Sequence, residues 1–184
     1  MIRLIIIVLA TAAGLTFGVP IASAASYNQD TLAQFRATVN DVSNRYGTGP
    51  VRITIAELGD NEAIAEARYG EITLDASWAM MSPSEFYANT ADDFATGYQP
   101  AGCGGIQSVA IHEMGHVIDG SRGMVARRAV ALAAANGRLG SDLHGYAYEY
   151  GSVKPGEAVA VSFQAVECGS ATATEQAIYN VLVN

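Results

Sequence analysis

The apolar positions of the chain follow a helical period first, then alternate with polar residues, and then return to a helical period. The first helical run has one apolar face, formed by Leu32, Phe35, Val39, Val42 and Tyr46. Asn28 or Asp30 is a typical helix-start residue and Gly47 a typical stop. We therefore expect an amphipathic helix between these signals.

Three short strands are predicted after this helix. Val51, Ile53 and Ile55 alternate with polar residues, and the segments 63–69 and 71–78 continue as strands on either side of a glycine. Residues 82–85 then resemble a helix-start capping box with proline at the first helical position. From there to residue 105 we expect a polar, glycine-containing connection.

Helical periodicity returns in the second half of the chain. Apolar residues surround positions 106–118, and Gly120 stands where glycine commonly ends a helix. A capping box of Thr172 and Glu175 is typical of another helix start. Three later helices are expected at 125–136, 156–166 and 172–182. This order predicts an α+β fold: a small N-terminal sheet packed on the helix at 106–118, followed by a helical C-terminal half.

The predicted helix at 106–118 contains the motif His112-Glu113-Met114-Gly115-His116. On an α-helix, positions i and i+4 share a face with a rise of about 6 Å, so both imidazoles can turn toward one ion. Glu113 would then point at a water molecule on that ion. Two of the three histidines of the chain lie in this motif. The spacing is a signature of zinc hydrolases, which makes Zn²⁺ the expected cofactor.

A catalytic zinc ion usually takes three protein ligands, so one more donor is needed. Asp119 lies about 10 Å along the helix axis from His112, too far for the same ion. We expect Asp119 to support a ligand imidazole, or to be a capping or surface carboxylate. Glu157 suits better, because Pro155 and Gly156 open a helix whose apolar body would carry the carboxylate inward. The remaining alternatives are Glu149, Glu167 and His144.

Two blocks of the sequence resemble the gluzincin metallopeptidases, the group that contains the anthrax lethal factor protease domain and the Pro-Pro endopeptidases. The blocks run from His112 to Asp119 and from Tyr150 to Phe163. As in that family, a tyrosine-glycine pair precedes the ligand glutamate by seven residues, and alanine and phenylalanine follow it at matching places. Val161 is a departure, because the family usually has a second glutamate there.

The resemblance implies a zincin-like fold in which His112, His116 and Glu157 hold the zinc ion and Glu113 is the general base. It also implies that Tyr150 supplies the hydroxyl that faces the substrate carbonyl. The expected function is therefore that of a secreted zinc metallopeptidase. In this endopeptidase the ion polarises the scissile carbonyl, and the base takes a proton from water and passes it to the leaving amine.

Two details of this interpretation have alternatives. Tyr146 and Tyr148 compete with Tyr150 for the hydroxyl role. The strand at 71–78 is our candidate for the edge that pairs with an extended substrate, and an ordinary interior strand is the alternative.

Two other functions fit the same motif less well. A deformylase-like hydrolase would need a cysteine ligand, and Cys103 stands too close before the motif. A catalytically silent zinc-binding or interaction module would have no use for Glu113 beside the metal.

Residues 1–24 have the features of a signal peptide: Arg3, an apolar run to Phe17, and a small-residue cleavage site ending at Ala24. An uncleaved membrane anchor is the alternative. Residues 25–184 are enough for a single domain. The net charge of −8 repels nucleic acid and anionic lipid surfaces. We expect a peptide or protein substrate, no nucleic acid, no membrane after signal cleavage, and a monomer.

The chain has two cysteines, Cys103 and Cys168. An even number in an exported protein predicts a disulfide. Cys103 precedes the motif helix and Cys168 follows the segment of Glu157, so the bond would join the two metal-bearing elements.

Overall fold

The structure, a computed structural model, describes residues 26–59, 63–68 and 70–184. The predicted signal peptide, residues 1–24, lies outside the described residues. The helices are α1 Gln29–Tyr46, α2 Ala76–Met80, α3 Pro83–Ala95, α4 Gly105–Ser121, α5 Val125–Ala135, α6 Pro155–Glu167 and α7 Ala173–Val183. The strands are β1 Arg52–Ala56, β2 Ala65–Arg68, β3 Glu71–Asp75, β4 Tyr148–Glu149 and β5 Ser152–Val153. The α+β class is thus confirmed.

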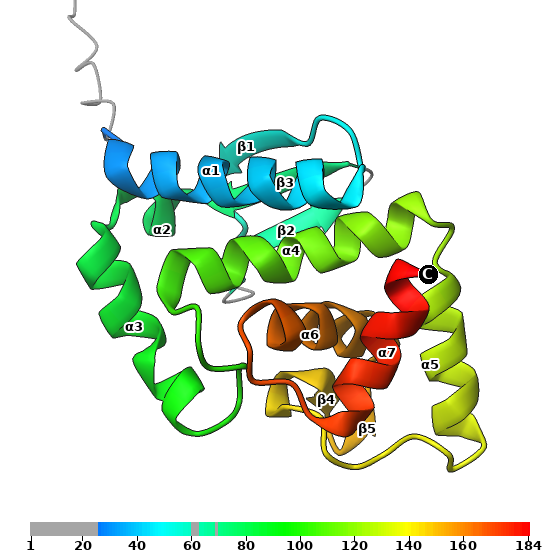
Figure 1. Cartoon of the computed structure of the whole chain (residues 1–184). Helices are drawn as coiled ribbons and strands as arrows, with labels where there is room; N and C mark the ends of the chain where they lie inside the picture. The colour runs from blue at the N-terminus through cyan, green and yellow to red at the C-terminus, as the bar shows by residue number, and fades with distance from the viewer. Residues whose placement is uncertain (1–25, 60–62, 69) are drawn as a thin grey trace, which may run out of the picture.

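Helix α1 begins and ends where the sequence signals predict. The Asn28 side chain accepts hydrogen bonds from the backbone N–H groups of Asp30 and Thr31, and Gly47 closes the helix at φ 67°. The apolar face of α1 is buried against α4, and Figure 1 shows the two helices running side by side. This contact covers one side of α4 and leaves the opposite side for α6.

The three-stranded sheet has the order β1-β3-β2, with β1 parallel and β2 antiparallel to β3. The predicted strand at 71–78 is therefore wrong in two respects. It ends at Asp75, because the Asp75 carboxylate accepts the N–H of Ser77 and starts α2. It is also the central strand, so its edges are occupied. Strand β2 is the edge strand that packs on α4.

The expected connection over 86–105 is wrong for about half of its length, because α3 continues to Ala95. Ser82 and Glu85 form the predicted capping box, and it opens the 13-residue helix α3. This helix packs against α4 and buries Phe86 and Thr90. Only the segment between α3 and α4 is a true connection.

Helix α4 is the centre of the molecule and contacts α1, α3, α6 and β2 (Figure 1). Its approach to α6 depends on Gly115, where a Cβ atom would lie 2.8 Å from Cα of Ala160. Any larger residue would push the two helices apart. The helix runs through Gly120 to Ser121, so Gly120 does not end it as predicted.

The cysteines form the predicted disulfide. The bond between Cys103 and Cys168 joins the segment before α4 to the residue that ends α6, with the two Cα atoms 5.0 Å apart. The two helices are therefore linked covalently as well as by packing. Among the described helices, none combines the length and the apolar character needed to cross a membrane.

Candidate metal centre

Three potential metal ligands meet between α4 and α6. His112 and His116 lie one turn apart on α4, and Glu157 lies in the first turn of α6. Their ligand atoms are all within 4.8 Å of one another, so this group could hold a metal ion. Two imidazole nitrogens and one carboxylate oxygen suit a divalent metal ion with one coordination position left for water.

A single carboxylate oxygen connects the two imidazoles. Glu157 Oε2 lies 3.1 Å from Nε2 of His112 and 3.4 Å from Nε2 of His116. Each of these nitrogens is an atom that commonly binds metals. A metal ion would replace the protons that the imidazole nitrogens share with the carboxylate.

The pKa shifts of His112 and Glu157 indicate that the group stabilises a positive charge beside the carboxylate. Burial opposes protonation of His112, but its hydrogen bond with Glu157 and the charge of Glu113 outweigh burial and raise the pKa of His112. Burial would raise the pKa of Glu157, but its hydrogen bonds with His112 and His116 hold that pKa well below the usual range. Both shifts stabilise an ionised carboxylate beside a positive charge.

The orientation of His112 is set by a residue that the sequence interpretation missed. The Nδ1 atom of His112 donates to Oε1 of Gln164 at 3.1 Å, and the amide of Gln164 donates to Oγ of Ser108 at 2.6 Å. This chain directs Nε2 of His112 toward Glu157. A signal exists in the sequence: Gln164 is a polar residue in an apolar helix, seven positions after Glu157 and so on nearly the same face.

The other candidate ligands do not belong to this group. Glu149 is exposed, Glu167 pairs with Arg45 at 2.6 Å, and His144 contacts Glu175 at 2.7 Å. Asp119, expected to support an imidazole or to be a capping or surface carboxylate, is fully buried and pairs with Arg127 at 3.1 Å. Asp119 therefore joins the end of α4 to α5 and does not reach the imidazoles.

Glu113 is the most unusual carboxyl group of the site. Its side chain is buried, and Oε2 has no hydrogen-bond partner among the described residues. Burial raises the pKa of the Glu113 carboxyl, while the neighbouring imidazoles lower it. A buried acceptor without a donor costs free energy unless a ligand or water satisfies it. Its position next to the ligand group makes it available for proton transfer.

The structure does not bring Tyr150 to this centre. Tyr150 lies in the turn between β4 and β5 at φ 49°, and its side chain is fully exposed. Tyr146 lies at the centre instead, with its ring centroid 5.2 Å from that of His112. Burial and the charge of Glu157 raise the pKa of Tyr146, so its hydroxyl stays protonated and can donate. Tyr148 pairs with Val153 in the short hairpin.

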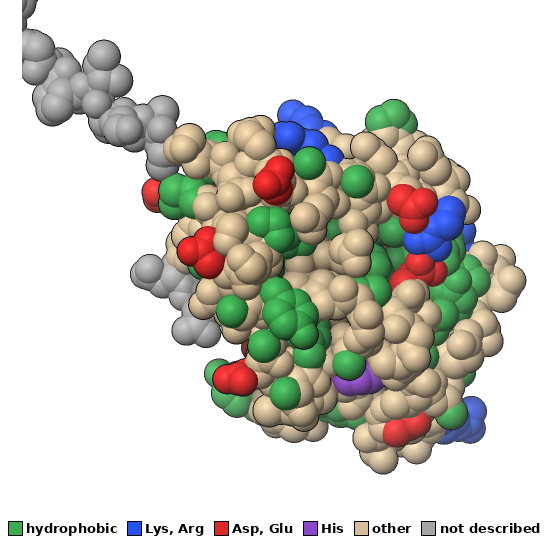
Figure 2. All heavy atoms as spheres, turned by 60° about the vertical axis from the view of Figure 1, so that its left-hand side comes forward, with side chains coloured by type: hydrophobic (Ala, Val, Ile, Leu, Met, Phe, Trp, Pro, Cys, Tyr) green, Lys and Arg blue, Asp and Glu red, His purple; other side chains and the backbone are tan. Residues whose placement is uncertain are grey.

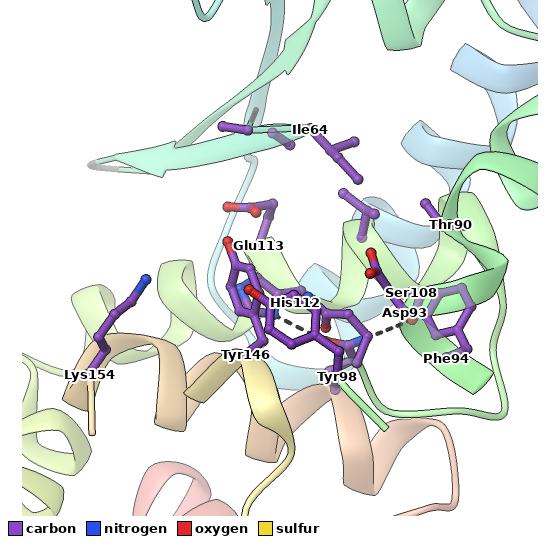
Figure 3. Close-up of a pocket in the computed structure, with 15 residues that line it drawn as sticks. Ile64, Thr90, Asp93, Phe94, Tyr98, Ser108, His112, Glu113, Tyr146 and Lys154 are labelled. Atoms are coloured by element: carbon purple, nitrogen blue, oxygen red, sulfur yellow. Dashed lines mark hydrogen bonds between the residues drawn. The ribbon is translucent and has the colours of Figure 1, made fainter. Parts of the chain in front are cut away.

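The centre opens into a cavity of about 400 Å³. Figure 3 shows Glu113 and Tyr146 with their polar ends directed toward the same part of it, above His112. The β2 edge strand contributes Ala65 and its neighbours to the opposite wall. In the space-filling view of Figure 2, a histidine side chain is visible in a recess between other side chains.

Four of the five predicted site residues are therefore together, namely His112, Glu113, His116 and Glu157. Tyr150 is the one left outside. Comparisons with known protein families, with curated proteins and with solved structures find no match for this chain.

Proposed function

We propose that this protein is a zinc-dependent endopeptidase. One observation supports this above all: the buried carboxylate of Glu113, whose Oε2 atom has no hydrogen-bond partner in the described part of the chain, lies beside the ligand group of His112, His116 and Glu157. A purely structural metal site has no need for such a carboxylate. The donor set of two imidazoles and one carboxylate suits catalytic zinc.

Each residue of the site has its own role in the proposed peptide hydrolysis. When bound, zinc supplies Lewis acidity and lowers the pKa of a water molecule toward about 7. Glu113 accepts the proton of the attacking water and then gives it to the leaving amine. Tyr146 donates a hydrogen bond to the oxygen on which negative charge develops. In this proposal Tyr146 takes the role that the family resemblance gave to Tyr150.

The edge of β2 supports a peptide as the substrate class. Within the described part of the chain, β2 pairs on one side only, with β3. Residues 65–68 of this strand line, together with Glu113 and His116, a second hollow that adjoins the cavity at His112 and Tyr146. An extended peptide can therefore add to the sheet as a further strand and present its carbonyl groups to the metal centre.

Export fits the same function. The Cys103–Cys168 disulfide is stable in an oxidising compartment, and the sequence of residues 1–24 is typical of a signal peptide. We therefore propose that the enzyme acts outside the cell.

A peptide library tests the proposal. Protein loaded with one zinc ion should cleave internal peptide bonds, a chelator should stop cleavage, and added zinc should restore it. Glu113→Gln should bind zinc normally and lose activity, because an amide accepts no proton. Glu149→Gln, on an exposed hairpin, is the matched control and should retain activity. Zinc binding without cleavage by the wild type would indicate a silent binding module instead.

The two tyrosines give a second test. Tyr146→Phe should lower kcat by roughly 100- to 1,000-fold, in the range seen for loss of one oxyanion donor, with little change in zinc affinity. Tyr150→Phe, in the exposed turn, should leave kcat unchanged. The reverse result would restore the role that the family resemblance implies.

A further inference from the structure

The cavity beside the metal centre has a negatively charged side chain at one end and a positively charged side chain at the other. Figure 3 shows Asp93 at one end, beside Phe94 and Thr90 of α3, and Lys154 at the other end. His112, Glu113 and Tyr146 lie between these ends. A peptide that lies across the reacting groups would therefore have a carboxylate on one side of the cleaved bond and an ammonium group on the other.

Among the described residues, no cationic side chain pairs with the Asp93 carboxylate. Its side chain is half-buried at the cavity wall, whereas the neighbouring Asp92 is exposed. Burial and the charge of Asp92 raise the pKa of the Asp93 carboxyl, and no described residue donates a hydrogen bond to it. Burying a carboxylate without a partner costs free energy, and a bound cation would offset this cost.

The walls around Asp93 suit a long side chain with an apolar stem. Phe94 lies beside Asp93 in Figure 3, and the apolar residues Val109 and Ile64 also line the cavity. Gln99, whose backbone N–H donates to the carbonyl of Asp93, lines the cavity as well, and its Oε1 atom is buried with no hydrogen-bond partner among the described residues. Lysine and arginine combine an aliphatic stem with a charged, donor-rich end, so they match apolar walls that lead to acceptors.

We propose that the acidic end of the cavity, at Asp93, selects a substrate with a lysine or arginine side chain on one side of the cleaved bond. The inference rests on the proposed peptidase function and adds its substrate class. Lys154, with its amino group 5.4 Å from the ring centre of Tyr146, repels a second basic side chain at the other end. The two ends therefore also set the direction in which a singly basic peptide lies across the centre.

A positional peptide library on the zinc-loaded full protein tests this selection. One position relative to the cleaved bond should be enriched in lysine and arginine. Replacing that residue by citrulline, which keeps the shape and loses the charge, should lower kcat/KM by roughly 10- to 100-fold, because a half-buried ion pair is lost. Asp93→Asn should impose the same loss on the arginine peptide, so that this variant cleaves the arginine and citrulline peptides with similar kcat/KM.

Two further variants sharpen the result. Asp92→Asn removes the adjacent, exposed charge and should keep the preference for the basic residue. Asp93→Lys should reverse the preference toward glutamate at the same position. Stoichiometric zinc binding by each variant shows that it is folded, because the ligands come together only in the folded chain.

The possible failures are distinct. Zinc-dependent cleavage with no basic preference, or with a preference that Asp93→Asn leaves intact, would overturn this inference and leave the peptidase function standing. If the zinc-loaded protein cleaves no peptide of the library, both the function and the inference are wrong.

Discussion

Two glutamates in this protein occupy the same position in their helices and contact histidines, yet only one contributes to a possible metal centre. Glu157 is the third residue of α6 and Glu175 the third residue of α7. Glu175 contacts a single imidazole, that of His144 at 2.7 Å. Glu157 contacts two imidazoles, those of His112 and His116, through one oxygen.

The two glutamates differ in their contacts because the N-cap residue, just before each helix, is different. Thr172 is the N-cap residue of α7. Its backbone N–H donates to Oε2 of Glu175, and the backbone N–H of His144 donates to Oε1 of Glu175. Lys154 is the N-cap residue of α6, but its side chain makes no capping hydrogen bond. The backbone N–H of Lys154 donates to the carbonyl of Ala147 and so is not offered to Glu157. Glu175 is therefore satisfied by fixed backbone donors, whereas Glu157 is left to the imidazoles. A capping box can thus turn a helix-start glutamate into a structural group.

Glu157→Ala should produce the largest change in metal binding. Loss of one of three ligands should weaken zinc affinity by more than about 100-fold, beyond the loss typical of a residue that only supports a ligand. Competition titration with a chromophoric chelator measures this change. Glu149→Ala and Asp119→Ala are the comparison variants, and near-native affinity in Glu157→Ala together with a large loss in either of them would contradict the ligand set.

Glu175→Gln should have the opposite profile. It removes the charge from a buried hydrogen-bonded pair, so the free energy of unfolding should fall by about 3 kcal/mol while zinc affinity stays native. Urea unfolding of the zinc-free protein measures the first quantity and chelator competition the second. Loss of zinc affinity without loss of stability would show that the two glutamates do not differ as described.

Acid unfolding separates the Glu175 contribution further. Burial would raise the pKa of Glu175, but hydrogen bonds from His144 and the backbone outweigh it and lower this pKa. A lowered pKa means that Glu175 stabilises the fold above the pKa of an unfolded glutamate, about 4.3, and that this stability is lost as the pH falls below it. In urea unfolding, Glu175→Gln should therefore lose less stability than the wild type between pH 5 and pH 3; an equal loss would contradict the role of the charge.

Gln164→Leu should weaken zinc affinity by roughly 10- to 100-fold, because Gln164 orients His112 without touching the ion. Gln176→Leu, at an exposed position of α7, is the matched control and should bind zinc as the wild type does. Equal affinities in the two variants would show that the contact with Nδ1 of His112 has no influence on the metal.

Lys154→Thr should give the smallest change in zinc affinity. It tests whether the residue before the helix decides if the glutamate binds imidazoles or caps the helix. It places the same residue type before α6 that begins α7, so a new capping box would compete for the Glu157 carboxylate. We expect zinc affinity to fall by roughly threefold to tenfold, the equivalent of about 1 kcal/mol. Lys154→Ala removes the charge without adding a cap, and a matching loss in that variant would assign the effect to charge.

Local signals allowed much of the fold to be predicted from sequence. Asn28 and Gly47 bound α1, and the two capping boxes open α3 and α7, because each signal acts within one helical turn. The arrangement of the strands could not be read in this way. The central position of β3 depends on pairing with β1 and β2, which no local pattern within β3 records.

The candidate site shows the same division. His112 and His116 share one helix face, so their convergence follows from spacing alone. Glu157 needed its helix start and the family resemblance. Tyr146 could not be selected over Tyr150, because Tyr146 precedes β4 whereas Tyr150 lies in the turn between β4 and β5, and counting residues along the chain does not reveal that turn.

Anomalous diffraction from crystals of the zinc-loaded protein, recorded on both sides of the zinc absorption edge, tests the central claim most directly. We predict one strong peak between His112, His116 and Glu157, with metal–ligand distances of about 2.0 to 2.2 Å. A peak at His144 and Glu175, or none near His112 and His116, would contradict it.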